Sequence, residues 1–427
     1  MSSRAGAHFD RRPGARSGTP GGAPPRSASR SQRLTATVGA GIALVVIWQA
    51  AGTGPRPTPA PAVDVDAPGE ITTDLVAWSG PAPAISINPR TVAAFDGGFA
   101  AVGATPASTP GVWWTTDGID WREAALPAMP TGIVGDGKGV ISFRGASGTR
   151  LERAGDALAI VAEFELPAFV RLGYDSARPA ITVTSRGLAI QSVYGELFFG
   201  EPHGGFAQAV ERGQWGLAID DPWLAATAPR SRLPCHPRQL ASNDYAPLVE
   251  APAGLYAFVS GSPDAPHGLY PGCSPQPWFS ESGLGWAPLS PVPVFPEEAH
   301  IYDVAYREGV FVAVGGIGDA GVVWTSADAV EWSALSPGSL TPLGDSFQPI
   351  SVAAGPAGWI ILAEDTSGDG TLGWVSIDGS CWDPLPDEIG GMHASVGRDR
   401  ILVAGSAARP ELWVGEVRHV AASCERG

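Results

Sequence analysis

The stretch WWTTDGIDW, residues 113–121, recurs three more times along the chain. The later copies read WFSESGLGW at 278–286, WTSADAVEW at 324–332 and WVSIDGSCW at 374–382. The shared pattern is W-x-[ST]-x-[DS]-[GA]-x-x-W, and we call each copy a box. A short motif that returns inside a longer unit is typical of repeat architectures. The box therefore decides the fold class.

The side chains of the box are suited to a tight turn between two strands. Hydroxyl and carboxylate oxygens accept hydrogen bonds from backbone N–H groups of their own turn, and the Gly or Ala suits a left-handed backbone. The closing Trp would bury a large ring beside the hairpin. We therefore predict a structural role for these residues, with direct ligand contact as the less favoured alternative. They are Thr115, Asp117, Trp121, Ser280, Trp286, Ser326, Asp328, Trp332, Ser376, Asp378 and Trp382.

Each complete unit divides into four short strands, predicted in the first unit at 91–95, 99–104, 111–116 and 121–126. A residue that opens the second strand marks seven units. These residues are Gly98, Gly139, Gly187, Gly254, Gly309, Gly358 and, in the last unit, Arg400. Four-stranded units at this spacing are the signature of a β-propeller. The predicted fold is all-β, with seven blades. Units two and three carry no recognisable box, which leaves six or eight blades as alternatives.

The boxes resemble the Asp-box (BNR) repeats of the sialidase-type propeller superfamily, in the shortened form S-x-D-G-x-x-W. The resemblance implies the propeller architecture but no single function, because such boxes occur in both enzymes and binding proteins. If the resemblance extended to the sialidases, it would imply an active site with three arginines that bind a carboxylate, a Tyr nucleophile with a Glu partner, and an Asp acid. Here the nearest candidate for the arginine motif is Asn88-Pro89-Arg90, and no arginine triad can be assigned. We predict no catalytic residue.

Composition and charge argue against one class of partner. The 427-residue chain has 56 Gly and 41 Pro and only 16% charged residues, which suits many short strands joined by turns. Residues 1–52 carry a net charge of +6 and the remainder carries −22, giving −16 for the whole chain. A strongly acidic propeller repels phosphate backbones, so we expect no nucleic-acid partner.

The N-terminal 70 residues differ from the rest of the chain. Residues 1–33 are rich in Arg, Ser, Gly and Pro and predict a disordered basic tail. Residues 34–53, LTATVGAGIALVVIWQAAGT, carry no charge and are just long enough to cross a bilayer as a helix. Arg26, Arg30 and Arg33 precede this helix, so its N-terminal end is expected in the cytoplasm. Residues 54–70 alternate Pro with small residues and predict an extended linker.

Together these segments predict a single-pass signal anchor in the cell membrane, with the propeller, residues 71–420, outside the cytoplasm. A cleaved signal peptide is the alternative. Its nearest A-x-A site, residues 60–62, lies well past the apolar run and contains Pro. Arg11-Arg12 matches a twin-arginine signal poorly because Pro13-Gly14 follows it. No Cys directly follows the apolar run, which argues against a lipoprotein anchor.

The first unit and the last unit are predicted to close the ring together. The last unit supplies three strands, at about 392–397, 400–405 and 411–417, and then the chain ends. Upstream of the first unit, residues 72–81 (TTDLVAWSGP) read as an outer strand. We predict that this segment pairs beside ELWVGEV, residues 411–417, and completes the seventh blade. Such closure removes exposed sheet edges.

The chain contains four cysteines, which in an exported domain predict two disulfides with three pairings open. Topology favours one pairing. Loops that join second to third strands, and one blade to the next, share one rim, which we call the loop rim; the box turns lie on the opposite box rim. Cys235 and Cys273 fall on the loop rim, and Cys381 and Cys424 on the box rim. We predict Cys235–Cys273 and Cys381–Cys424, the second tying down the C-terminal tail, residues 421–427.

A long insertion, residues 212–246, is the most individual part of the chain. With the loop 262–277 it is predicted to cap the loop rim, and binding usually resides in loops held on a rigid scaffold. The alternative is a loop whose aromatic residues pack on the propeller. Candidate contact residues, of types enriched at interfaces, are Trp215, Trp223, Arg230, Arg232, His236, Arg238 and Tyr270.

Metal and cofactor motifs receive little support. DTSGDG, residues 365–370, partly resembles a calcium loop with candidate ligands Asp365, Ser367 and Asp369. Ser stands in place of the middle acid and no Glu occupies the twelfth position, so a plain hairpin turn is favoured. Histidines are scattered singly, and no P-loop, G-x-S-x-G or dinucleotide fingerprint occurs. We predict no cofactor.

Three functions are compatible with these patterns. The leading hypothesis is a membrane-anchored binding or interaction module that meets a protein or glycan partner at the capped loop rim. The second is a sialidase-like glycoside hydrolase, which would gather three Arg, a Tyr and two or three carboxylates at the central mouth of one rim. The third is a structural protein of the cell envelope.

Overall fold

The computed structural model describes residues 70–72, 75–80, 88–104, 110–124, 126, 130, 132–144, 147–165, 181–191, 197–201, 205–210, 247–259, 275–290, 294–296, 299–318, 320–335, 340, 347–365, 370–405 and 411–418. All of them belong to the compact unit Asp64–Gly427. The predicted tail, transmembrane segment and linker up to residue 69, and the C-terminal tail, lie outside the described residues.

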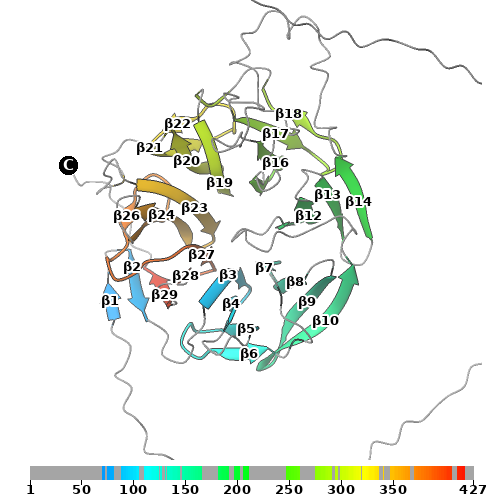
Figure 1. The fold of residues 1–427 in the computed structure, drawn as a ribbon, viewed down its shortest axis with the longest axis vertical. Helices are drawn as coiled ribbons and strands as arrows, with labels where there is room; N and C mark the ends of the chain where they lie inside the picture. Colours follow the sequence, from blue (N-terminus) through cyan, green and yellow to red (C-terminus); the bar gives the residue numbers. More distant parts are fainter. Residues whose placement is uncertain are drawn as a thin grey trace, which may run out of the picture. The chain divides into compact units, whose positions relative to one another are not determined.

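Seven antiparallel sheets surround a common centre, so the predicted seven-bladed propeller is confirmed (Figure 1). Blade one contains β3 (Asn88–Phe95), β4 (Gly98–Ala104), β5 (Pro110–Thr115) and β6 (Arg122–Ala124). Blade two contains β7 (Gly132–Gly135), β8 (Gly139–Arg144), β9 (Ser147–Ala154) and β10 (Ala157–Glu165). Blade three contains β11 (Ile181–Thr184), β12 (Gly187–Gln191), β13 (Leu197–Glu201) and β14 (Gly205–Val210).

The remaining blades repeat the same meander. Blade four contains β15 (Leu248–Ala251), β16 (Gly254–Val259), β17 (Gln276–Ser280) and β18 (Ala287–Pro288). Blade five contains β19 (Ala299–Arg307), β20 (Val310–Ile317), β21 (Ala320–Ser326) and β22 (Ser333–Ala334). Blade six contains β23 (Phe347–Gly355), β24 (Gly358–Asp365), β25 (Thr371–Ser376) and β26 (Asp383–Pro384). Blade seven contains β27 (His393–Val396), β28 (Arg400–Ala404), β29 (Leu412–Val417), β2 (Val76–Ser79) and β1 (Glu70–Thr72).

The residues that open the second strands stand where the sequence placed them. Six of the seven second strands begin at the marked Gly or Arg, and β20 begins at Val310, directly after Gly309. The glycine is needed because the strand starts close to the backbone of the third strand. A Cβ on Gly98 would lie 2.2 Å from the carbonyl oxygen of Thr115, and one on Gly358 would lie 2.4 Å from that of Ser376.

Blade seven is built from both ends of the propeller. β2 pairs antiparallel with β29 in the register Val76↔Val417 and Trp78↔Gly415, and β1 adds a fifth strand outside β2. The Trp78 ring is completely buried and packs in one cluster with Trp413, Ile401 and Val403. The predicted closure is therefore present, and β1 extends it.

The hydrophobic core lies between the faces of neighbouring blades. Between blades one and two, Val112 and Trp114 pack with Val140 and Leu151, all nearly inaccessible to solvent. Equivalent clusters join blade seven to blade one and blade five to blade six. Blades one, two, five, six and seven each bury both of their faces in such clusters, so the ring must be complete for those faces to be covered.

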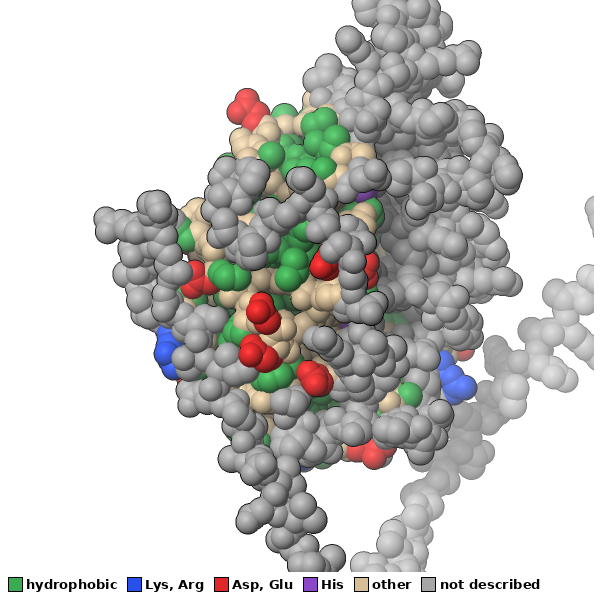
Figure 2. All heavy atoms as spheres, turned by 60° about the vertical axis from the view of Figure 1, so that its left-hand side comes forward, with side chains coloured by type: hydrophobic (Ala, Val, Ile, Leu, Met, Phe, Trp, Pro, Cys, Tyr) green, Lys and Arg blue, Asp and Glu red, His purple; other side chains and the backbone are tan. Residues whose placement is uncertain are grey.

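The charged side chains on one face of the described part are mostly acidic (Figure 2). Figure 2 shows carboxylates spread over one face, with basic side chains at its margins, in keeping with the net charge of −16. Within the described ranges the secondary structure is β, and no helix there has the length and apolar character needed to cross a bilayer.

Candidate functional site

The four boxes form nearly identical turns between third and fourth strands. In the first box, the Asp117 carboxylate accepts hydrogen bonds from the N–H groups of Ile119 and Asp120, both at 2.8 Å. The Thr115 hydroxyl accepts the N–H of Gly118 at 2.8 Å, and the Trp121 indole donates to the Gly118 carbonyl at 3.1 Å. The boxes that contain Asp328 and Asp378 repeat this network. The degraded box keeps the Ser280 and Trp286 bonds.

The box turns also attach each blade to its neighbour. A Cβ on Gly118 would lie 2.6 Å from the side chain of Val414 in blade seven, so this turn packs directly on the preceding blade. Two arginines reach the boxes from that direction. Arg400 of blade seven donates to the Thr116 carbonyl at 3.0 Å, and Arg307 of blade five donates to the Ile377 carbonyl. The oxygen atoms of the boxes are engaged within the turns, which supports the structural role over ligand contact.

The charged form of each box aspartate is favoured by its turn. At Asp328 the N–H groups of Glu331 and Val330 lower the pKa of the carboxyl below its ordinary value, and this outweighs the effect of burial. At Asp117 and Asp378 burial raises the pKa, but hydrogen bonds from the turn outweigh it and the net direction is again downward. These aspartates are therefore ionised acceptors, and proton transfer near neutral pH is not their chemistry.

Several predicted site residues cannot be placed. The candidate contact residues of the cap, Trp215 to Arg238 and Tyr270, lie outside the described residues, as do Cys235, Cys273 and Cys424. Cys381 is disulfide-bonded; its pairing with Cys424 stays a prediction. Of the weak calcium candidates only Asp365 is described, and its N–H donates to the Gly370 carbonyl at 3.1 Å, as in a hairpin. The described residues contain no group of three side chains suited to a metal ion.

A polar cluster joins β19 and β23, the first strands of blades five and six. Tyr302 lies at a bulge within β19, and its hydroxyl accepts a hydrogen bond from the Gln348 amide. The His300 ring packs edge-on against Tyr302, with centroids 4.7 Å apart. The Asp303 carboxylate accepts bonds from the Ser351 hydroxyl and the Val352 N–H, both at 3.1 Å. Asp303 thus joins two blades.

Blade two differs from the box-containing blades in its outer strand. β10 has nine residues, whereas β6, β18, β22 and β26 have two or three, because a box uses the same length of chain for its turn. β10 also contains a bulge: Ile160 faces Leu151 and Ala162 faces Arg150, so Val161 is an extra residue. A one-residue bulge reverses which side chains face which side of the sheet.

The reversal has a visible result in the packing. Before the bulge, Leu158 packs toward blade one, in the cluster that contains Val140 and Leu151. After it, Phe164 packs toward blade three, edge-on to Phe143 at a centroid distance of 6.5 Å. If β10 alternated regularly, with Val161 itself paired, Phe164 would share a face with Leu158. The bulge therefore turns Glu163 and Glu165 to the face of the sheet that looks toward blade one.

On that face, two rows of polar side chains cross three strands. The register pairs Ser142 with Thr149 and Thr149 with Glu163, which gives the first row. It pairs Arg144 with Ser147 and Ser147 with Glu165, which gives the second row. Residues two apart on a strand share a face, so both rows project together. The row between them, Phe143, Gly148 and Phe164, points to the other side.

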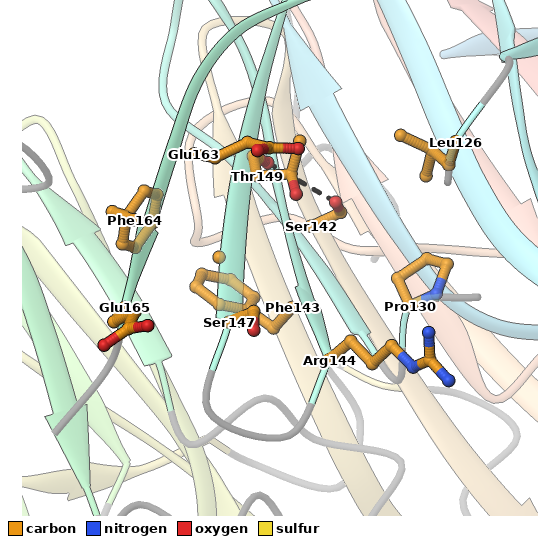
Figure 3. A pocket seen from close by; sticks show the side chains of 11 residues that line it. Leu126, Pro130, Ser142, Phe143, Arg144, Ser147, Thr149, Glu163, Phe164 and Glu165 are labelled. Carbon is orange, nitrogen blue, oxygen red and sulfur yellow. Dashed lines mark hydrogen bonds between the residues drawn. The ribbon is translucent and has the colours of Figure 1, made fainter. Parts of the chain in front are cut away.

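A cavity of about 390 Å³ opens at the loop rim beside these rows, and Phe143, Gly148 and Phe164 of the row between them line it as well (Figure 3). Leu126 and Pro130, from the connection between blades one and two, form its opposite wall. Arg144, Glu163 and Glu165 are exposed, and none makes an ion pair with a residue that the structure describes. The loop rim thus presents charged groups that are available to a ligand. We call this the blade-two cavity.

The sequence patterns did not single out this site. Unit two lacks a box, but in its last strand, ALAIVAEFE, the large apolar residues from Leu158 to Phe164 fall at alternate positions, so the sequence gives no sign of the bulge. The four boxes lie on the opposite rim, and the predicted cap belongs to blades three and four.

Comparisons with known proteins show the fold alone. No protein-family model and no curated protein matches the chain. Among solved structures, a streptogramin B lyase is 10% identical with a TM-score of 0.43, over 81% of this chain and 98% of that one. The β-propeller domain of the trilobed protease from Pyrococcus furiosus is 10% identical with a TM-score of 0.46, over 78% and 98%. Hydrazine synthase from Kuenenia stuttgartiensis is 10% identical with a TM-score of 0.48, over 83% and 98%.

Proposed function

We propose that the chain is a non-enzymatic binding module, a membrane-anchored Asp-box propeller that presents its loop rim to a partner outside the cytoplasm. The observation that carries the proposal is the blade-two cavity. It lies on the rim that the sequence assigns to binding, and it displays three exposed charged side chains that make no ion pair with described residues. Charged groups placed this way are typical of recognition surfaces.

The box rim supports the same division of roles. Its aspartates, hydroxyls and indoles are engaged in their own turns, and Arg307 and Arg400 reach across to neighbouring blades. These contacts hold the scaffold together. Hydrogen-bonded turns thus stabilise the box rim, while exposed charged side chains lie on the loop rim. This arrangement is expected of a scaffold that displays a binding surface.

The membrane anchor rests on the sequence. Residues 34–53 are uncharged and long enough to span a bilayer, with arginines on the N-terminal side only. A linker of alternating Pro and small residues would hold the propeller away from the bilayer. The proposal is thus a tethered module whose partner is a protein or a glycan of the cell envelope.

The experiment is surface crosslinking of the tagged full-length chain, expressed in its native host, followed by identification of what co-purifies. One enriched partner is expected. Its recovery should fall on deleting residues 214–244 and on the substitutions R144Q and E163Q, while E281Q, on an exposed box residue, should leave it unchanged.

Thermal melting of each variant separates loss of partner from loss of fold. Recovery of the partner at full yield from all loop-rim variants would overturn the proposal. Cleavage of a panel of sialosides by the purified chain would replace it with the hydrolase.

A further inference from the structure

We propose that the blade-two cavity binds a small zwitterion, a flexible ligand with a cationic amine at one end and an anionic group at the other. The inference rests on the proposed function, because both assign binding to the loop rim. It goes further by naming the chemical class of ligand and the residues that select it.

The cavity has walls of opposite charge. Arg144 ends β8 and extends toward Pro130, whereas Glu163 and Glu165 project from β10 on the other side (Figure 3). One strand, β9, lies between β8 and β10 and contributes Ser147 and Thr149. Because neighbouring strands are about 4.8 Å apart, the backbones of Arg144 and Glu165 are separated by roughly 10 Å. This spacing keeps the two charges apart and leaves room for a ligand between them.

Each wall matches one end of such a ligand. A guanidinium binds a carboxylate through two parallel hydrogen bonds, so Arg144 would hold the anionic end. An ammonium group has three donors and suits a site with two carboxylates, so Glu163 and Glu165 would hold the cationic end. The hydroxyl groups of Ser147 and Thr149 would face the chain between the two ends. A volume of about 390 Å³ is in the range of small-molecule sites.

A ligand with only one charge fits this cavity less well. An anion alone would meet two glutamates and the field of a chain with net charge −16. A cation alone would approach Arg144, which repels it. A zwitterion can pair with Arg144 and with the two glutamates at once, and its zero net charge avoids long-range repulsion by the negatively charged chain.

The bulge at Val161 indicates that this arrangement is built into the strand. It adds the one residue that lets Phe164 join the blade-three interface while both glutamates face the cavity. Gly148 completes the arrangement, because a Cβ there would lie 2.3 Å from the Phe164 ring. The apolar row and the polar rows thus depend on the same backbone irregularity.

The test is a titration of the purified full-length chain with ω-amino carboxylates, followed by ligand-observed NMR and calorimetry. The probes are glycine, 4-aminobutanoate, 6-aminohexanoate and 8-aminooctanoate, with hexylamine and hexanoate as single-charge controls. We expect one of the longer zwitterions to bind at least tenfold more tightly than either control, which corresponds to about 1.4 kcal/mol. Glycine, whose charges are too close to reach both walls, is expected to bind no better than the controls.

Variants assign the two ends. R144Q should reduce the affinity for the best zwitterion to that for hexylamine, and the double variant E163Q/E165Q should reduce it to that for hexanoate. R186Q and E281Q, at exposed positions outside the cavity, should change nothing. Equal binding of hexylamine and the zwitterion, equal binding of hexanoate, or no binding of any probe would each overturn the proposal. Because partner capture uses macromolecules and this titration uses small probes, either can fail while the other succeeds.

Discussion

At the scale of single residues, the Gly or Ala position of the box has the same left-handed backbone in each copy but different side chains around it. Gly118 and Gly379 have φ of 84° and 79°, and the third box places Ala329 there at 62°. A Cβ on Gly379 would lie 3.3 Å from its nearest side-chain atom, whereas one on Gly118 would lie 2.6 Å from Val414. Ala329 demonstrates that the angle alone tolerates a methyl group. The contacts with the neighbouring blade therefore determine how much stability is lost when alanine replaces glycine at this position.

We expect Gly379→Ala to lower the free energy of unfolding by about 1 kcal/mol, the cost of a left-handed alanine. Gly118→Ala should cost at least about 2 kcal/mol, because its methyl group also collides with blade seven. Urea denaturation of both variants measures the difference. Adding Val414→Ala to Gly118→Ala removes the two Cγ atoms at 2.6 Å but keeps the Val414 Cβ position at 2.7 Å, so the collision is partly relieved. This double variant should therefore be more stable than the sum of its single changes predicts. An additive result would show that steric contact with blade seven is not the cause.

The box aspartates should make stability depend on acid. The carboxylate of Asp328 accepts the Val330 and Glu331 N–H groups at 2.8 and 2.9 Å, and its folded pKa lies below the ordinary value of 3.8. Its contribution is therefore complete above about pH 5 and is lost as pH falls through the folded pKa. Asp328→Asn should cost about 1 kcal/mol near pH 7. That difference should shrink below about pH 4 in urea denaturation at a series of pH values. A difference that stays constant to about pH 3 would contradict the assignment, and E281Q serves as the control.

At the scale of elements, the β10 bulge tests whether pairing with β9 fixes the faces of β10. Deleting Val161 removes the extra residue but leaves Glu163 facing Thr149 and Phe164 facing Gly148, so each side chain should keep its side of the sheet. The deletion should therefore cost no more than about 2 kcal/mol, because no carboxylate enters the apolar interface with blade three. Val161→Ser keeps the residue count at a site that is 49% exposed, and should change stability by about 0.5 kcal/mol or less. Thermal melting and urea denaturation measure both variants, and a loss of more than about 4 kcal/mol on deleting Val161 would contradict the preserved pairing with β9.

The same strand shows where prediction from the sequence stopped. The boxes and the strand-opening glycines are local signals, because each reports a turn or a close backbone approach within one blade. They predicted the seven blades and their second strands. The direction of Glu163 and Glu165 depends instead on the register between β9 and β10, which no local pattern encodes. The cavity also needs Leu126 and Pro130 from the neighbouring blade, so only the folded chain brings its walls together.

At the scale of the whole molecule, stability should depend on an outer strand that comes from the opposite end of the propeller. Trp78 is completely buried against Trp413, and Gly415 lies so close that a Cβ there would meet the Trp78 ring at 2.8 Å. A chain beginning at residue 85 lacks β1 and β2. It leaves this face of blade seven uncovered and the β29 edge unpaired. We expect this truncation to melt broadly and at lower temperature, or to aggregate. Trp78→Ala in the full-length chain should cost about 3 to 5 kcal/mol.

A chain beginning at residue 68 is the matched control, because it loses the N-terminal segments but keeps both closing strands. It should melt as sharply and as high as the full-length chain. If the shorter truncation, beginning at residue 85, melted like this control, the closing strands would be dispensable and the ring would hold through its other interfaces. If both truncations were equally unstable, the stabilising contacts would have to lie upstream of residue 68. The expected pattern is a stable control and an unstable truncation. Only this pattern would show that the pairing of the two ends in blade seven stabilises the whole propeller.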